Sequence, residues 1–242
     1  MMKILLILLL VSQLTWAQTV PDYAKEIRWA EQVEEGIMEG DVVWLKANNH
    51  EFMSIFTPSE SNTQKTAIIV HGLGVHADWS QVVQPLRTAL TQQGFNTLSI
   101  QMPVLKNGVE SEGYAPLFNA VDKRIAAAVE YLQSQDLEPD ALIAHSLGSV
   151  MSVHYLANNP QAFKRFVGVG MPDMTVKYLA KINIPMLDLH GTKDIQSVLH
   201  SVKGRAKAAK LNADYLQMQV DADHFFDEKD ALLINKVGAW LK

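Results

Sequence analysis

The amino-acid sequence predicts an α/β domain in which a mostly parallel, doubly wound sheet is flanked by helices on both faces. Short apolar runs alternate with longer stretches of helical periodicity from Thr66 onward. The apolar runs are continuous, as expected for strands buried on both faces of a parallel sheet. Such alternation of strands and helices typically forms a parallel sheet with helices on either side. The predicted strands are 66–70, 95–102, 141–145, 166–171, 184–190 and 215–220.

Helical spacing of apolar residues predicts the helices between these strands. These helices are 79–93, 117–134, 147–159, 197–209 and 231–241. Residues 23–38 show the same spacing and predict a peripheral helix. The segment 41–58 instead predicts two strands joined at Asn48 and Asn49, because asparagine tolerates the left-handed backbone of a hairpin turn.

The N-terminus has the composition of a secretory signal peptide. Lys3 precedes an apolar run at 4–11, and Thr15 and Ala17 provide small residues at the cleavage positions. The apolar run is too short to span a bilayer comfortably, so no stable transmembrane segment is expected after cleavage. We therefore expect a periplasmic or secreted protein. The predicted organisation is a signal peptide at 1–17, an N-terminal helical extension at 18–40 and a single domain at 41–242.

Charge and cysteine content exclude several classes of function. The net charge is −5 without long basic blocks, which argues against a nucleic-acid partner. The densest basic stretch, 203–210, is interpreted as a solvated helix face. The absence of cysteine excludes thiol catalysis and thiolate metal sites. His71, His76 and Asp78 match no closed metal site, so no metal is expected. No dissociable cofactor is expected either, because the acyl-transfer chemistry considered below needs none.

Residues with chemical function follow the carboxyl ends of the predicted strands, where the sites of open parallel sheets are found. A glycine-rich loop, His71-Gly72-Leu73-Gly74, follows the first of these strands. Ser146, Asp194 and His224 follow three later ones. A serine becomes a nucleophile when an imidazole accepts its proton and a carboxylate orients that imidazole. This set of side chains therefore predicts acyl transfer.

Acyl transfer also needs two N–H donors for the oxyanion that forms on the substrate. The backbone N–H of Leu147 lies at the first turn of the helix after Ser146, and that of Leu73 lies between two glycines. These two groups are the predicted oxyanion hole.

The strand, sharp turn and helix around Ser146, with Ser, Asp and His in that chain order, resemble the α/β-hydrolase superfamily from about Asp41 to the C-terminus. The usual turn is Gly-x-Ser-x-Gly, and Ala144 departs from it in AHSLG. The resemblance implies that Ser146 is the nucleophile, Asp194 the acid and His224 the base. HGLGVHADW together with AHSLGS is similar to an uncharacterised, exported proteobacterial branch, which implies no substrate.

The assignment of the acid has rivals. Asp173 is the main one, because some members of the superfamily place their acid one strand earlier, and the others are Asp188, Asp221 and Asp223. The histidines at other strand ends, His71, His145 and His190, are interpreted as hydrogen-bonded supports for loops.

Loop lengths bear on the substrate. Only about a dozen residues separate 166–171 from 184–190, so no large cap domain is expected and the site should be open. In the longer connection 103–118, Tyr114, Leu117 and Phe118 either line an acyl pocket or anchor a surface loop.

The sequence therefore predicts a serine hydrolase of carboxylesterase or thioesterase type, acting on a small-molecule or acyl ester through an acyl-enzyme. A peptidase or amidase using the same triad is one alternative. The other is a non-catalytic envelope binding protein that retains the fold, since fold alone does not establish catalysis.

Overall fold

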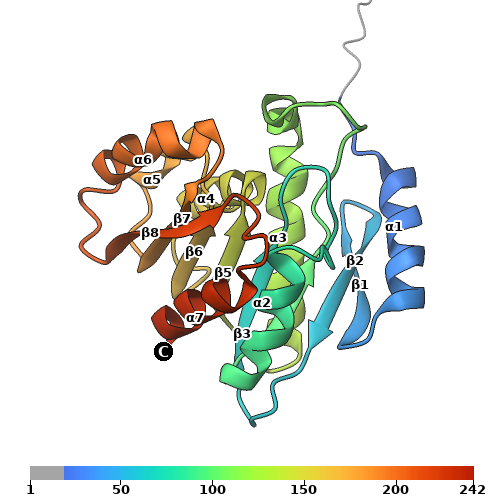
Figure 1. Cartoon of the computed structure of the whole chain (residues 1–242). Coiled ribbons are helices and arrows are strands. Elements are labelled where there is room, and N and C mark those ends of the chain that lie inside the picture. The colour runs from blue at the N-terminus through green and yellow to red at the C-terminus, as the bar shows by residue number, and fades with distance from the viewer. Residues whose placement is uncertain (1–18) are drawn as a thin grey trace, which may run out of the picture.

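The computed structural model describes residues 19–242, which form an eight-stranded sheet with helices on both faces (Figure 1). The strand order is β1-β2-β4-β3-β5-β6-β7-β8. The first two pairings, β1 with β2 and β2 with β4, are antiparallel, and the remaining pairings are parallel. The predicted fold class, a mostly parallel doubly wound sheet, is confirmed.

The strands are β1 (Asp41–Ala47), β2 (His50–Thr57), β3 (Lys65–Val70), β4 (Asn96–Ile100), β5 (Glu138–His145), β6 (Arg165–Val169), β7 (Met186–Lys193) and β8 (Tyr215–Asp223). The α-helices are α1 (Tyr23–Gly36), α2 (Val83–Ala89), α3 (Phe118–Ser134), α4 (Leu147–Asn158), α5 (Val176–Leu179), α6 (Gln196–Ala208) and α7 (Asp230–Leu241). Three 3₁₀ helices are η1 (Leu90–Gln93), η2 (Ser111–Leu117) and η3 (Asp173–Thr175).

Alternate residues of each central strand enter two separate cores. In β3, Ile68 and Val70 pack with α3 and α4 on one face of the sheet. Ala67 and Ile69 pack with α2 and α7 on the other face. Successive side chains of a strand point to opposite faces, so burial on both sides requires the continuous apolar runs seen in the sequence.

The hairpin and most helices lie where the sequence predicts them. Asn48 and Asn49 join β1 to β2 with φ values of 51° and 60°. The helix expected at 79–93 is shorter, because Val82 has a φ of 64° and α2 begins only after it. Only η3 and α5 lie between β6 and β7, so residues 19–242 contain no large cap domain.

Helix α1 lies beside β2 and is bonded to the loop that follows β4 (Figure 1). Glu26 of α1 pairs with Arg124 of α3 at 2.9 Å and accepts the backbone N–H of Val104 at 3.3 Å. The ammonium of Lys25 donates to the Asn107 side chain at 2.7 Å. The predicted signal peptide at 1–17 lies outside the described residues. Within 19–242, no helix is both long and apolar enough to cross a bilayer.

The basic stretch in α6 is not wholly a solvated face, and the interpretation of Arg205 is wrong. Arg205 is completely buried. Its guanidinium donates to Asp188 of β7 at 2.7 Å and to the carbonyl of Met171 after β6 at 2.7 Å. Arg205 lies on the same helix face as the buried Val198 and Ser201, a spacing of three to four residues that sets it inward while its lysine neighbours remain exposed.

Candidate active site

Ser146 occupies the sharp turn between β5 and α4. Its backbone has φ 53° and ψ −124°, a conformation that non-glycine residues adopt only when their surroundings enforce it. The turn brings the chain against the loop after β3: a Cβ added at Gly148 would lie 2.3 Å from the carbonyl oxygen of His71. Position 148 therefore requires glycine. Ala144, the departure from the usual pattern, is buried in the apolar core, which accommodates its methyl group.

The three residues predicted to form the triad lie within hydrogen-bond distance of one another. The Nε2 atom of His224 lies 2.9 Å from the Ser146 hydroxyl, and its Nδ1 atom lies 2.5 Å from Asp194 Oδ1. Asp194 follows β7 and His224 follows β8, so parallel neighbouring strands bring them to the same edge of the sheet. In the matching tautomer, Nδ1–H donates to the carboxylate and Nε2 accepts the serine proton.

Asp194 is held as a carboxylate. Burial alone would raise its pKa, but the hydrogen bond and charge of His224 oppose this. The backbone N–H groups of Gly191 and Ile195 also donate to its two oxygens, at 3.2 and 2.8 Å. The net result is a lowered pKa for Asp194, so the carboxylate is ionised at neutral pH and orients the imidazole.

The rival acids lie elsewhere. Asp173 begins η3, is exposed and makes no hydrogen bond to His224 in the described chain. Asp223 accepts the backbone N–H groups of the turn after β8, and Asp221 pairs with Lys193 at 3.4 Å. Of the candidates considered, Asp194 is the carboxylate that contacts the His224 ring.

His71 and His145 support loops, as expected. His71 donates from Nδ1 to the Gly72 carbonyl at 2.8 Å and accepts the Met102 N–H at Nε2 at 2.9 Å, which joins the glycine loop to the chain after β4. His145 donates from Nε2 to the His224 carbonyl at 2.9 Å, with the two rings 4.8 Å apart. The interpretation of His190 is wrong: neither ring nitrogen of this buried side chain has a hydrogen-bond partner among residues 19–242.

The two buried supporting imidazoles predict a loss of stability in mild acid. Burial lowers the pKa of His71 to about 3 and that of His145 to about 4. Below the usual histidine pKa near 6.5, the unfolded chain binds protons that the folded chain does not, so stability falls as the pH drops from about 6.5 towards 4. Each imidazole contributes up to about 1.4 kcal/mol per pH unit.

Urea unfolding at pH 7.5 and 5.0 measures this effect. We expect the free energy of unfolding to be lower at pH 5.0, and the difference between the two pH values to shrink in His71→Gln. An unchanged difference in that variant would mean that His71 does not contribute to the pH dependence.

A cavity of about 390 Å³ opens directly onto Ser146 and His224. Its remaining walls come from the glycine loop, η2, the η3 turn and the start of α6. The side chains beyond the triad and its supports are mainly apolar, with three carboxylates, and they are Leu73, Val75, Trp79, Glu110, Ser111, Glu112, Pro172, Asp173, Met174, Ile195, Ser197 and Phe225.

The acyl-pocket role considered for Tyr114, Leu117 and Phe118 is wrong. Tyr114 and Leu117 of η2 and Phe118 at the start of α3 are all buried in the core. The Tyr114 hydroxyl also accepts the backbone N–H of Leu105 at 3.0 Å, so these side chains anchor the loop. The part of 103–118 that lines the cavity is 110–112. Sequence reasoning missed it because a polar 3₁₀ turn carries no pattern that indicates which of its residues face a cavity.

Of the two predicted oxyanion donors, Leu147 follows the nucleophile directly in the chain, and Leu73 lines the same cavity as Ser146. Leu73 and its neighbour Gly72 line the cavity, and Leu147 is the first residue of α4. Within the described chain, neither the Leu73 nor the Leu147 backbone N–H donates a hydrogen bond to another protein group. In residues 19–242, no group of three or more His, Asp or Glu side chains is placed to hold a metal ion.

Of the comparisons with known proteins, those with solved structures bear on the fold. Residues 2–116 match a family described as a protein of unknown function, DUF3530. No curated protein matches the chain. Among solved structures, Est1E from Butyrivibrio proteoclasticus is 14% identical, with a TM-score of 0.67 over 84% of this chain and 98% of its own.

Two further structures show the same likeness. The esterase Pf2001 from Pyrococcus furiosus is 15% identical, with a TM-score of 0.69 over 84% of this chain and 91% of its own. Dienelactone hydrolase from Anabaena variabilis is 17% identical, with a TM-score of 0.67 over 84% of this chain and 96% of its own. The chain has the α/β-hydrolase fold, as the sequence predicts.

Proposed function

We propose that this protein is a serine hydrolase that cleaves an ester or thioester through an acyl-enzyme on Ser146. The single observation that carries the proposal is the chain of hydrogen bonds from Ser146 to His224 to Asp194 at the base of an open cavity. The esterases and hydrolases named among the similar structures support the same class of activity.

In the first half of the reaction, Ser146 Oγ attacks the carbonyl carbon while His224 Nε2 accepts the serine proton. Asp194 stabilises the resulting imidazolium. The oxyanion accepts hydrogen bonds from the backbone N–H groups of Leu73 and Leu147, the second of which also lies at the positive end of the α4 dipole. His224 then donates its proton to the leaving oxygen or sulfur, and the acyl group remains on Ser146.

In the second half, His224 accepts a proton from water as that water attacks the acyl carbonyl, and Ser146 leaves with the proton that the imidazole returns. Apart from the substrate and water, these steps use only groups of the chain. An open cavity without a cap domain suits esters better than peptides, which favours the esterase or thioesterase over the peptidase. The other alternative, a non-catalytic binding protein, is tested by the labelling experiment that follows. We also propose export to the periplasm or beyond, on the strength of the signal-peptide pattern at 1–17.

Labelling with a fluorophosphonate tests the proposal directly. We expect one adduct on the folded mature protein, located on Ser146 by peptide mapping, because only an activated serine reacts at neutral pH. A folded protein that forms no adduct at Ser146 would contradict a catalytic role and favour the binding protein.

A further inference from the structure

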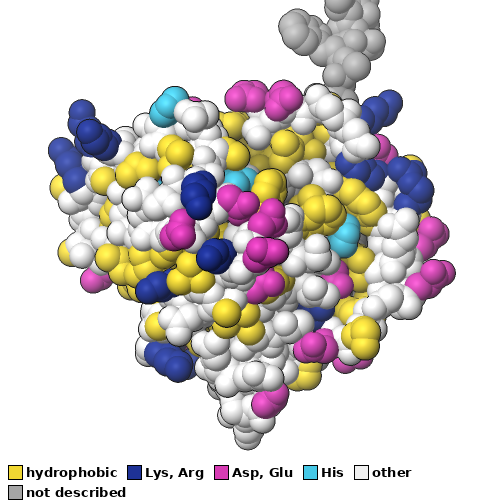
Figure 2. All heavy atoms as spheres, in the orientation of Figure 1, with side chains coloured by type: hydrophobic (Ala, Val, Ile, Leu, Met, Phe, Trp, Pro, Cys, Tyr) yellow, Lys and Arg dark blue, Asp and Glu magenta, His cyan; other side chains and the backbone are white. Residues whose placement is uncertain are grey.

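The cavity above Ser146 combines apolar walls with negative charge. Trp79, Met174 and Phe225 contribute large apolar surfaces, and no lysine or arginine is among the lining residues. Three of the exposed large hydrophobic side chains of residues 19–242, Leu73, Ile195 and Phe225, line this cavity. On the face shown in Figure 2, hydrophobic, acidic and basic side chains lie side by side over the middle. An apolar part of a ligand would therefore find contacts from the base of the cavity to its rim.

Three carboxylates line the cavity from two segments of the chain. Glu110 directly precedes η2, Glu112 lies within η2, and Asp173 begins η3. All three residues are exposed. Within the described chain, none of these carboxylates accepts a hydrogen bond or pairs with a basic side chain, and Glu110 does not cap η2. Their charge is therefore not neutralised by the protein and acts on whatever enters.

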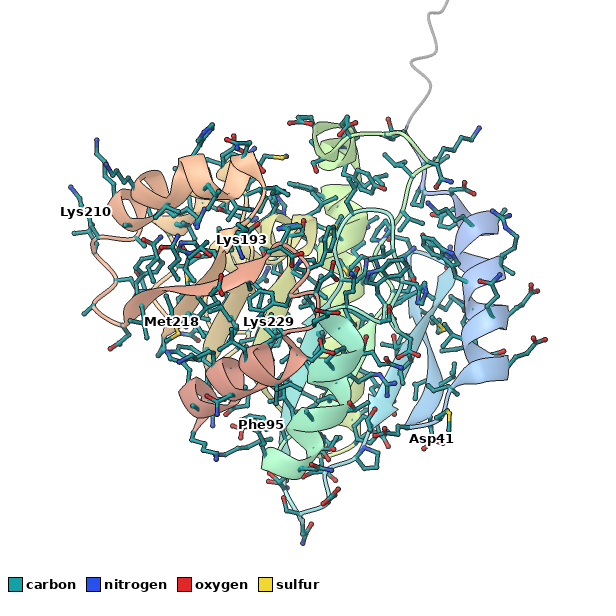
Figure 3. The ribbon with its side chains drawn as sticks, viewed as in Figure 1. Asp41, Phe95, Lys193, Lys210, Met218 and Lys229 are labelled. Atoms are coloured by element: carbon teal, nitrogen blue, oxygen red, sulfur yellow. The ribbon has the colours of Figure 1, made fainter. Side chains whose placement is uncertain are left out.

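The other titratable groups of the cavity do not offset this charge. Burial lowers the pKa of His145 to about 4, so its imidazole is neutral at pH 7. Lys193, at the end of β7 (Figure 3), pairs with Asp221 at 3.4 Å. The three carboxylates of the cavity wall therefore have no basic side chain of the lining to offset them.

A neighbouring hollow of about 330 Å³ is lined by Lys25 and Lys106 and shares Leu73 and Glu110 with the cavity. The ammonium of Lys25 already donates to the Leu105 carbonyl at 3.3 Å and to Asn107 at 2.7 Å. Within this hollow, the exposed Lys106 is therefore the lysine that could attract the distant part of an anionic ligand.

We infer that this site takes esters or thioesters with an apolar acyl group and an uncharged or cationic leaving group, and that it rejects anionic acyl donors. The inference rests on the proposed function and narrows its substrate class. Because charges at a cavity mouth act on the approaching ligand, an anionic leaving group faces repulsion from the carboxylates on both sides. A thioester of coenzyme A, with its phosphates, belongs to the rejected group.

Two thioesters with the same acyl group and the same scissile bond test the inference. Butyryl-N-acetylcysteamine is uncharged, whereas butyryl-coenzyme A carries several negative charges. At low ionic strength we expect kcat/KM for the uncharged thioester to exceed that for the coenzyme A thioester by about tenfold or more. The ratio of the two values should fall at about 0.5 M salt, because salt screens the repulsion. An octanoyl pair repeats the measurement with a longer chain.

Charge-neutralising variants locate the effect. Glu110→Gln combined with Glu112→Gln should reduce the ratio between the two thioesters several-fold. Glu51→Gln combined with Glu60→Gln is the matched control, because it also removes two exposed carboxylates but both lie outside the cavity, and it should leave the ratio unchanged. An equal effect in this control would show that the preference follows the net charge of the protein, and it would overturn the inference.

The remaining outcomes separate the inference from the function on which it rests. Cleavage of the coenzyme A thioester at an equal or higher kcat/KM would overturn the inference and leave the hydrolase intact. A loss of that cleavage in Lys106→Gln would then assign the anion to the neighbouring hollow. Cleavage of neither thioester, with no fluorophosphonate adduct on Ser146, would overturn the proposed function and the inference together.

Discussion

Replacing Ser146 with alanine is expected to lower kcat for ester hydrolysis by roughly 10⁴-fold or more, with the fold preserved. The variant removes the nucleophilic oxygen, which the imidazole of His224 contacts at 2.9 Å. It leaves the backbone of the turn in place, because the strained φ of 53° is enforced by β5, α4 and the glycine contacts around it. Initial rates on a short-chain ester measure the loss of kcat, and thermal unfolding of the same preparation measures whether the fold is preserved.

Ser149 provides the matched control. Its buried hydroxyl donates to the Ala144 carbonyl at 3.0 Å, on the core side of α4 rather than towards His224. We expect Ser149→Ala to lose about 1 kcal/mol of stability while retaining activity. Unchanged turnover in Ser146→Ala, or equal losses of activity in both variants, would exclude Ser146 as the nucleophile.

Asp194→Asn is expected to lower kcat by about 10³- to 10⁴-fold. The carboxylate accepts the Nδ1 proton of His224 and so leaves Nε2 free to accept the serine proton. An amide at position 194 can present its N–H to Nδ1, which favours the tautomer with the proton on Nε2, and that nitrogen can then no longer act as the base. Measuring kcat across pH 5 to 9 separates this effect from a change in substrate binding.

Two other aspartates complete the experiment. Asp221→Asn removes a fully exposed carboxylate that pairs with Lys193 and should leave kcat unchanged. If Asp173→Asn instead lost turnover by orders of magnitude while Asp194→Asn retained it, the acid would have to be reassigned to the end of β6.

The local features of this protein were predictable because their causes are local. A strand buried on both faces needs an uninterrupted run of apolar residues, so β3 and β5 could be placed from that run in the sequence. Asn48 and Asn49 mark a hairpin because few residues tolerate its backbone. Likewise, the pattern around Ser146 is set by the close approach of Gly148 to His71, a steric demand that leaves its trace in the sequence.

Features that depend on packing between distant segments were not predictable. From the sequence, Arg205 is expected to be exposed like the lysines of α6. It is buried instead, because its guanidinium donates hydrogen bonds to Asp188 and to the Met171 carbonyl. His190 was expected to hydrogen-bond, but its ring has no hydrogen-bond partner among residues 19–242 and lies 3.9 Å from Asp188. Tyr114 lies in the core, while its polar neighbours Glu110 and Glu112 line the cavity.

The sequence by itself determined the class of fold, the strand ends at which Ser146, Asp194 and His224 lie, and the order in which they occur. Only the tertiary structure decided that Asp194 rather than Asp173 contacts His224, and which side chains enclose the cavity. The physical reason is the distance along the chain over which each kind of interaction acts. Periodicity and turn chemistry act over a few residues, whereas the charge and shape of the cavity arise where η2, η3 and the turn after β8 meet, segments that follow different strands of the sheet.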